Sequence, residues 1–389
     1  MSSIDTVIRG EKTFTVNGDS DRHHYCKPHL IQQNTSSEKC SNSSINTNNS
    51  SDSMAKVEDS DCSSIERVEM EDQVDTKEYK LQIVWTNVFL QILLHTSFLW
   101  EFLYLRKNPE RWETHWTLAK FNAAYALFTG LGVTAGAHRL WSHRSYKAKA
   151  PLRLFLAISF AGAGQNDIYE WSRDHRVHHK FSETDADPHN ASRGFFFSHM
   201  GWLMCKKHPD VIRKGRSVDM SDLLQDPIVA WQRKYYRWLV LIFNVLFPTL
   251  FPMYYWNIPF LQCIYMSFAR YAVSLHLTWL VNSAAHIQGS RPYDTRIGPR
   301  EQNFWKIPNF LGEMYHNYHH VFPQDYKASE YGWLGQWNLS ALFIDLMAWI
   351  GQAYDLREAP RSVVNQRKER TGEYSKMYRK IERKDSDLH

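Results

Sequence analysis

The hydrophobic positions of the chain fall into four long runs, each close to the ~20 apolar residues that a helix needs to cross a bilayer. The runs cover residues 81–105, 117–137, 238–256 and 260–281. They come in two pairs with short connections, so we expect four crossings that return the chain to its starting side. Two prolines in the third run predict a kink. A shorter apolar run, residues 151–164, is too brief to span and is expected at the interface or inside the protein.

The polar stretches between these runs all fall on one side if the chain crosses four times. That side would hold residues 1–76, residues 138–236 and everything after residue 282, with most of the Lys and Arg. Positive residues favour the cytosolic side of a membrane. The pattern therefore predicts an all-α membrane protein with four transmembrane helices and a cytosolic helical cap.

The two ends of the chain differ from the apolar middle. Residues 1–76 are polar and low in complexity, so we expect a disordered leader, and their lack of an apolar segment argues against a secretory signal. They also pull the mean hydropathy down to −0.50. Residues 77–357 are expected to form one membrane domain, and residues 358–389 a basic cytosolic tail.

Charge and cysteine content exclude other classes. The formal net charge is only +5, and the basic run at residues 367–384 contains interleaved acids, which is typical of a solvated helix rather than a nucleic-acid contact. The 5 cysteines form no CxxC pair or regular framework, so neither a disulfide scaffold nor a zinc–thiolate site is expected.

Histidines gather in three clusters on the predicted cytosolic side. His-x-x-His-His occurs twice, and residues at i, i+3 and i+4 share one helix face, so each set forms a trident. The first pair is five residues apart, about 140° around an ideal helix, and needs a helix end or a distorted turn to serve one site. Asn282 and His286 add an i, i+4 pair at the end of the fourth run. The clustered histidines are His138 and His143, then His175, His178 and His179, then His316, His319 and His320.

Nine imidazoles exceed the needs of one ion. Imidazole suits Fe, Zn, Cu and Ni, and a zinc site uses three or four protein ligands. Nine histidines and one amide therefore fit two metal ions. Nearby carboxylates are expected to accept hydrogen bonds from the outer ring N–H groups; they are Asp174, Glu313 and the acids of residues 182–187. His95, His115 and His276, within the apolar runs, are expected to be satisfied core residues.

A metal pair beside lipid favours oxidation of a long apolar substrate, because breaking an unactivated C–H bond requires an oxidised metal and O2. Five segments strongly resemble the animal acyl-CoA desaturases, the stearoyl-CoA desaturase family of the endoplasmic reticulum, which has many insect members. They are residues 136–153, 166–190, 193–203, 278–286 and 316–326, within a match that covers about 84–355.

The resemblance implies a four-span helical fold, two iron ions (Fe2+), O2 as co-substrate and a saturated fatty acyl-CoA as substrate, with delta-9 desaturation favoured. By position it assigns the nine clustered histidines, including His286, as iron ligands, with Asn282 holding an iron-bound water. It assigns acyl-CoA contacts to Asn87, Asn166, Arg173, Asp174, Lys206, Lys207 and Trp279. Lys and Arg suit the polyanionic CoA.

The family draws outside electrons from NADH through a reductase and cytochrome b5. Some relatives fuse this carrier and show a His-Pro-Gly-Gly haem motif, whereas His208-Pro209 is followed here by Asp210. We therefore expect a separate donor protein that docks on the cytosolic face, and both termini and the active site in the cytosol.

Some positions depart from the family pattern: Gly164, Gln302, Met314 and Gln324. None removes a ligand, and they bear on chain length and double-bond position. Ala126 and Gly130 lie one turn apart and are small, so we hypothesise a roomy end to the acyl tunnel. The alternatives are another regiochemistry such as delta-11, a hydroxylase using the same di-iron centre, a histidine-rich membrane metal transporter, and an inactive homologue.

Overall fold

The structure is a computed structural model that describes residues 79–302, 308–375 and 377. The predicted leader at 1–76 lies outside the described residues, as does the end of the predicted tail. Within this part of the chain the fold is helical, and its only named strands are the two-residue β1 (Lys147–Ala148) and β2 (Ala353–Tyr354), which pair antiparallel.

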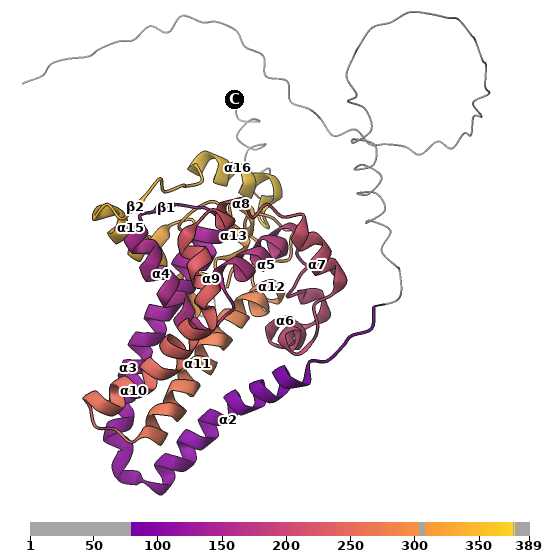
Figure 1. Ribbon diagram of the computed structural model, residues 1–389. Helices are drawn as coiled ribbons and strands as arrows, with labels where there is room; N and C mark the ends of the chain where they lie inside the picture. Colours follow the sequence, from indigo (N-terminus) through magenta and orange to yellow (C-terminus); the bar gives the residue numbers. More distant parts are fainter. Residues whose placement is uncertain (1–78, 303–307, 376, 378–389) are drawn as a thin grey trace, which may run out of the picture. The chain divides into compact units, whose positions relative to one another are not determined.

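Long helices occupy the four predicted apolar runs. They are α2 (Trp85–Lys107), α3 (Trp112–Leu131), the continuous segment α9 (Pro227–Val240), η5 (Leu241–Leu246) and α10 (Phe247–Tyr255), and α11 (Phe260–Asn282). Figure 1 shows α2, α3, α10 and α11 projecting from a cap of shorter helices. By length and composition, two described helices are able to cross a membrane, Trp85–Lys107 and Pro227–Tyr255.

The helix boundaries differ from the predicted runs. The second run was expected to continue to residue 137, but α3 ends at Leu131 and passes into a π-helix, η2 (Gly132–Ser142). The third run was expected from residue 238, whereas its helix begins at Pro227, after the capping residue Asp226. Hydropathy misses this start because Gln232, Arg233 and Lys234 interrupt the apolar residues of α9.

The predicted proline distortion is a π-helical segment. Pro248 has no N–H to bond the carbonyl of Asn244, four residues earlier, so that carbonyl is free. It accepts instead from Nη2 of Arg270 on α11 at 3.1 Å. The neighbouring carbonyl of Phe243 accepts from the hydroxyl of Tyr125 on α3. The freed carbonyls thus tie three long helices together.

The short apolar run forms α4 (Ala150–Ala163), which buries one face inside the protein and leaves Leu154 and Phe155 exposed. Leu156 and Phe160 are fully buried, and α4 packs against η2, α9 and α3. Gly132 permits close packing, because a Cβ there would lie 2.2 Å from the backbone N of Phe160. α4 therefore buttresses the segment that carries the first histidine pair.

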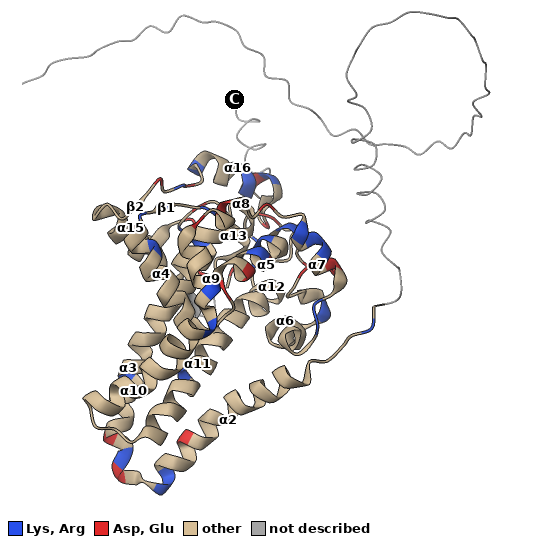
Figure 2. Ribbon diagram, in the orientation of Figure 1, with Lys and Arg blue, Asp and Glu red and all other residues tan. Residues whose placement is uncertain are grey.

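The cap consists of short helices and loops. Charged side chains concentrate there, and the long helices are almost free of them apart from the turn between α2 and α3 (Figure 2). The remaining elements are η1 (Pro109–Arg111), α5 (Ile168–Phe181), η3 (Ala191–Arg193), α6 (Phe195–His199), η4 (Gly201–Met204), α7 (Pro209–Arg216), α8 (Ser221–Leu224), α12 (Ala284–Ile287), η6 (Pro308–Leu311), α13 (His316–Val321), α14 (Gly332–Gly335), α15 (Leu339–Trp349) and α16 (Arg361–Thr371).

The predicted C-terminal tail begins with a packed helix. Val364 of α16 is buried, Arg367 pairs with Asp294 at 2.5 Å, and Lys368 pairs with Glu330 at 2.6 Å. These contacts hold α16 against two segments, one before and one after the third histidine cluster in the sequence.

Candidate metal centre

The first histidine pair lies on the π-helix η2, whose 11 residues are all buried. In a π-helix the backbone bonds run from i+5 to i, and here the N–H of His143 bonds the carbonyl of His138 at 3.1 Å. The two rings are therefore close, with centroids 4.9 Å apart. Of the two expected arrangements, a helix end or a distorted turn, the structure has both, because His143 caps the end of the π-helix.

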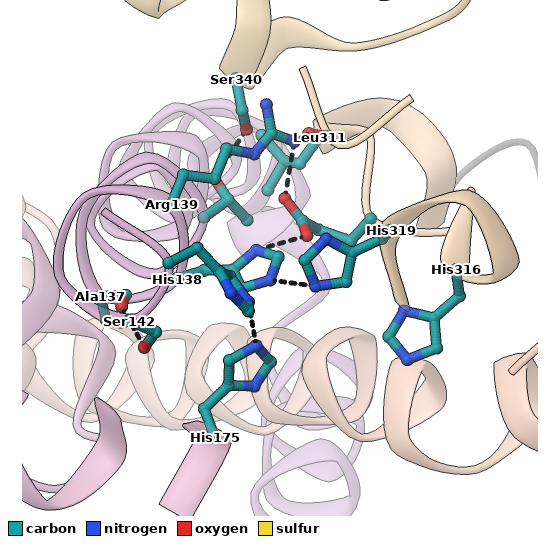
Figure 3. A network of polar contacts seen from close by, with 12 residues as sticks. Ala137, His138, Arg139, Ser142, His175, Leu311, His316, His319 and Ser340 are labelled. Carbon is teal, nitrogen blue, oxygen red and sulfur yellow. Dashed lines mark hydrogen bonds and ion pairs between the residues drawn. The ribbon is translucent and has the colours of Figure 1, made fainter. Parts of the chain in front are cut away.

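The histidines converge into two groups. In each group the ligand nitrogens all lie within 4.8 Å of one another. The first group is His138, His143, His175, His179 and His319, and the second is His178, His286, His316 and His320. His138, His175 and His319 point toward one another in Figure 3, although they come from η2, α5 and α13.

Each predicted trident is divided between the two groups. On α5, His175 and His179 belong to the first group and His178 to the second. On α13, His319 belongs to the first group, and the remaining two histidines belong to the second. The shared helix face was predicted correctly, but it spans enough of the circumference to serve two neighbouring pockets.

The outer ring nitrogens of two histidines face carboxylates. Glu313 accepts from Nδ1 of His138 at 2.8 Å, and Asp187 accepts from Nδ1 of His178 at 2.8 Å. A neutral imidazole carries one N–H, so both rings turn a bare Nε2 lone pair inward. The Nε2 of His178 has no hydrogen-bond partner among the described residues.

The close contacts inside the first group fit a shared cation. Nε2 of His319 lies 2.9 Å from Nε2 of His138 and 2.9 Å from Nε2 of His179. The Nε2 of His319 carries at most one proton and cannot donate it to both neighbours. The Nε2 of His138 carries no proton to donate. A cation at the centre satisfies all three lone pairs, as metal-ligating histidines with outward N–H bonds do.

Burial keeps these rings neutral. It lowers the pKa of six of them well below the ordinary histidine range, and the neighbouring imidazoles lower it further; the six are His143, His175, His179, His316, His319 and His320. A neutral imidazole is the form that binds a metal. The donor set of both groups therefore fits metal ions bound mainly through nitrogen.

Arg139 supports the first group and was not identified from the sequence. It is 1% exposed and donates to Glu313 at 2.8 Å and to the carbonyls of Leu311 and Tyr326 at 3.1 and 3.0 Å. Burial opposes ionisation, but the charge of Arg139 and the hydrogen bonds from His138 and Arg139 lower the pKa of Glu313. The only sequence signal for Arg139 was its position directly after His138.

One predicted carboxylate has another partner. Asp174 was expected to accept from a ligand histidine, but it pairs with Arg173 at 2.9 Å and with Lys207 at 2.5 Å. Its neighbour Glu170 also contacts Lys207, at 3.0 Å. Asp174 lies one residue before His175, so its side chain leaves the helix on another face and reaches Lys207, two residues before α7.

Near the start of α2 the chain contacts the segment that carries Lys206, whose N–H bonds the carbonyl of Gln82. The residue before α2, Val84, bonds the carbonyl of Met204, and Asn87 donates to the carbonyl of Leu203 at 2.8 Å. A small pocket in the cap is lined by Arg193, Lys206, Lys207 and His208, together with the carboxylates of Asp185 and Asp187.

The two remaining expected contacts, Asn166 and Trp279, are connected through a neighbour. Asn166 precedes α5 with a φ of 72°, and its neighbour Gln165 donates to Thr278 on α11 at 2.9 Å. Thr278 adjoins Trp279, which is 3% exposed. Asn282, the last residue of α11, is half-buried four residues before His286.

The histidines expected in the core are all hydrogen-bonded. His115 bonds Glu101 at 3.0 Å, at the end of the long helices away from the cap. His95 and His276 bond each other at 2.9 Å. His276 also bonds His199 of α6, so the two are part of a larger arrangement that the sequence did not indicate.

Comparison with known proteins agrees with this site. The fatty acid desaturase family model matches residues 114–356, and the chain belongs to that family. It is 53% identical over 298 residues to stearoyl-CoA desaturase 5 of Bos taurus, covering 76% of this chain and 86% of the relative. It is 52% identical over 300 residues to the acyl-CoA Delta-9 desaturase of Acheta domesticus, covering 76% and 81%. The human stearoyl-CoA desaturase 5 is 52% identical over 294 residues, covering 75% and 86%.

Proposed function

We propose that this protein is an acyl-CoA desaturase that introduces a delta-9 double bond into a saturated fatty acyl-CoA, with two iron ions as cofactor and O2 as co-substrate. The observation that carries the proposal is the pair of histidine groups, with five and four nitrogens, in a chain of this family. When bound, the iron would supply the activation of O2 that removes two hydrogens from the acyl chain.

The residues around the iron would fix its ligands. Glu313 and Asp187 hold two imidazoles in the tautomer that turns Nε2 inward, and Arg139 holds Glu313. The nine histidines would bind the two ions, and Asn282 would hold a water between α11 and the second group.

The acyl-CoA would lie across the cap. Lys206, Lys207 and Arg173 provide cations for the phosphates of CoA, with Asp174 holding two of them in place. Asn87 and Asn166 would bind the polar part of the CoA. Trp279 is placed to contact the start of the acyl chain, because it is buried on α11 three residues before Asn282.

The proposed function also implies an arrangement of the helices in the membrane. We infer that α2, α3, the segment α9–η5–α10 and α11 form four spans in the endoplasmic reticulum membrane, with the cap and both termini in the cytosol. The concentration of charge in the cap supports this orientation (Figure 2). Two electrons would come from NADH through a reductase and cytochrome b5, docking on the cap. With the two electrons from the substrate, they reduce O2 to two waters.

Expression in a desaturase-deficient yeast tests the proposal. Gas chromatography of the lipids should reveal new fatty acids with a double bond at carbon 9. His316→Ala should abolish them, whereas His115→Gln, a matched histidine of the long helices, should retain them. Wild-type protein that reaches the membrane and forms no unsaturated product would refute the proposal.

A further inference from the structure

Three histidines outside the metal groups form a chain of hydrogen bonds across α2, α11 and α6. His95 contacts the carbonyl of Gln91 through Nδ1 at 2.6 Å and His276 through Nε2 at 2.9 Å. Nδ1 of His276 lies 2.9 Å from Nε2 of His199. Nδ1 of His199 lies 2.9 Å from the hydroxyl of Ser283.

The chain ends on the backbone of Trp279. The hydroxyl of Ser283 donates to the carbonyl of Trp279 at 2.8 Å. Ser283 is fully buried and directly follows α11. A carbonyl, which only accepts, therefore lies at each end of the chain, at Gln91 and at Trp279.

The hydrogen-bond chain is one proton short when its three imidazoles are neutral. The five contacts in series each need one proton. Three neutral imidazoles and one hydroxyl bring four. In the neutral chain one of the five contacts therefore lacks a proton, and the tautomers of the three rings decide which one. A fifth proton, which adds one positive charge, completes every contact.

The indole of Trp279 lies among the same three rings. Its centroid is 5.2 Å from that of His276, 5.7 Å from that of His199 and 6.5 Å from that of His95. An aromatic face stabilises a nearby cation, and Trp does so best. The indole therefore favours the protonated form of the hydrogen-bond chain, and the three imidazoles of that chain lie around the indole.

The charged groups on the elements that pack around the chain are engaged elsewhere. Arg193 of η3 stacks on the ring of Phe197 at 3.5 Å, Glu101 of α2 bonds His115, and Arg270 of α11 bonds Asn244. On α12, His286 belongs to the second metal group. Burial lowers the pKa of His199, and His276 lowers it further, so the fifth proton is bound only as the pH falls below the ordinary histidine range.

We propose that His95, His276, His199 and Ser283 form one proton-sharing chain that positions Trp279 for acyl-CoA binding. The three histidines are positioning residues in this proposal, since they act through Trp279. The inference rests on the proposed function, in which Trp279 contacts the acyl-CoA. It predicts an effect on substrate affinity, and not on the chemical step.

The test is acyl-CoA binding to the full-length, iron-loaded protein in lipid nanodiscs. His276→Phe interrupts the chain at its centre, and His276→Gln replaces the imidazole with an amide that still offers one donor and one acceptor. Ser283→Ala removes only a hydroxyl and breaks the hydrogen-bond chain next to Trp279. It tests the same proposal if His276→Phe does not fold. His115→Gln is the matched control, because His115 contacts Glu101 and not Trp279.

We expect His276→Phe and Ser283→Ala to raise the Kd and KM for a long saturated acyl-CoA about tenfold, with the kcat and iron content unchanged. His276→Gln should recover most of the affinity, and the control should bind like the wild type. The ratio of the Kd of His276→Phe to that of the wild type should rise as the pH falls from about 7 to about 5, because the wild-type chain then gains its fifth proton.

Trp279→Ala distinguishes the positioning role of the histidines from the role of Trp279 in acyl-CoA binding. If it weakens binding while the chain variants bind like the wild type, the positioning role is wrong and the role of Trp279 stands. If Trp279→Ala itself binds like the wild type, both are wrong. A Kd ratio that does not change with pH would overturn proton sharing, because a purely structural contact has no reason to titrate over this range.

Discussion

Asp187 accepts a hydrogen bond from Nδ1 of His178 at 2.8 Å, and both side chains are almost fully buried. Burial opposes ionisation of Asp187, but the hydrogen bonds from His178 and from the backbone N–H of Glu183 outweigh it and lower its pKa. The anionic carboxylate fixes the tautomer of His178, so that the bare Nε2 faces the second metal group.

The first prediction follows from this pair. Asp187→Asn should weaken metal binding in the second group and activity by about 10–100-fold, because an amide is a poorer acceptor and no longer sets the tautomer. Iron retention under a chelator measures the effect. Asp210→Asn is the control, since its exposed pair with Arg213 contributes little. Equal iron retention in both variants would show that Asp187 does not support a ligand.

The second prediction concerns the CoA phosphates. Lys207→Met should raise the KM for acyl-CoA about tenfold with little change in kcat, because it removes a charge that acts in binding alone. The KM should also become less sensitive to salt. Lys214→Met is the matched control on α7, where the ammonium lies over the ring of Phe181. An unchanged KM for Lys207→Met would place the CoA elsewhere.

The third prediction concerns Glu301, beside the third histidine cluster. Its carboxylate bonds the N–H of Tyr318 at 2.8 Å, and burial, with a further contribution from Glu330, raises its pKa to about 8. Because this value lies above that of the unfolded chain, the folded state binds the proton more tightly. Stability is therefore lost as the pH rises from about 5 to about 8.

Glu301→Gln measures this loss, because a neutral amide does not titrate. The free energy of unfolding of the wild type, relative to Glu301→Gln, should fall with rising pH at up to about 1.4 kcal/mol per pH unit. Thermal unfolding at a series of pH values provides the comparison. Parallel curves for the two proteins would mean that Glu301 is ionised in the folded state.

The fourth prediction concerns acyl chain length. Ala126→Tyr should shift the products toward shorter chains, because a large ring on α3 would shorten the proposed tunnel. Ala123→Tyr is the control, since Ala123 is exposed on the outer face of the same helix. Gly130, the other small residue, faces Leu311, whose Cδ1 would lie 2.9 Å from an added Cβ. An unchanged chain-length profile in Ala126→Tyr would remove Ala126 from the tunnel end.

Much of this architecture follows from the sequence. Hydropathy locates the long helices, and the i, i+3, i+4 spacing places each histidine trident on one face. The five-residue spacing of His138 and His143 indicates a distorted turn, which the structure contains as a π-helix. These features are local, so a pattern along the chain is enough to predict them.

The rest depends on how distant segments pack. The division of each trident between two groups is set by the approach of α13 to α5, and spacing along one helix holds no information on it. Arg139 acquires its role through carbonyls from Leu311 and Tyr326. Asp174 was assigned to a histidine because it adjoins one in sequence, whereas the fold brings Lys207, from the segment before α7, to it.

The most direct test of the central claim is the number of iron ions bound per chain in purified, iron-loaded protein. We expect about two in the wild type, and about one in each of two double variants, His138→Ala with His319→Ala and His316→Ala with His320→Ala. Fewer than two ions in the wild type, or the loss of both ions in either double variant, would contradict two separate histidine-bound metal sites.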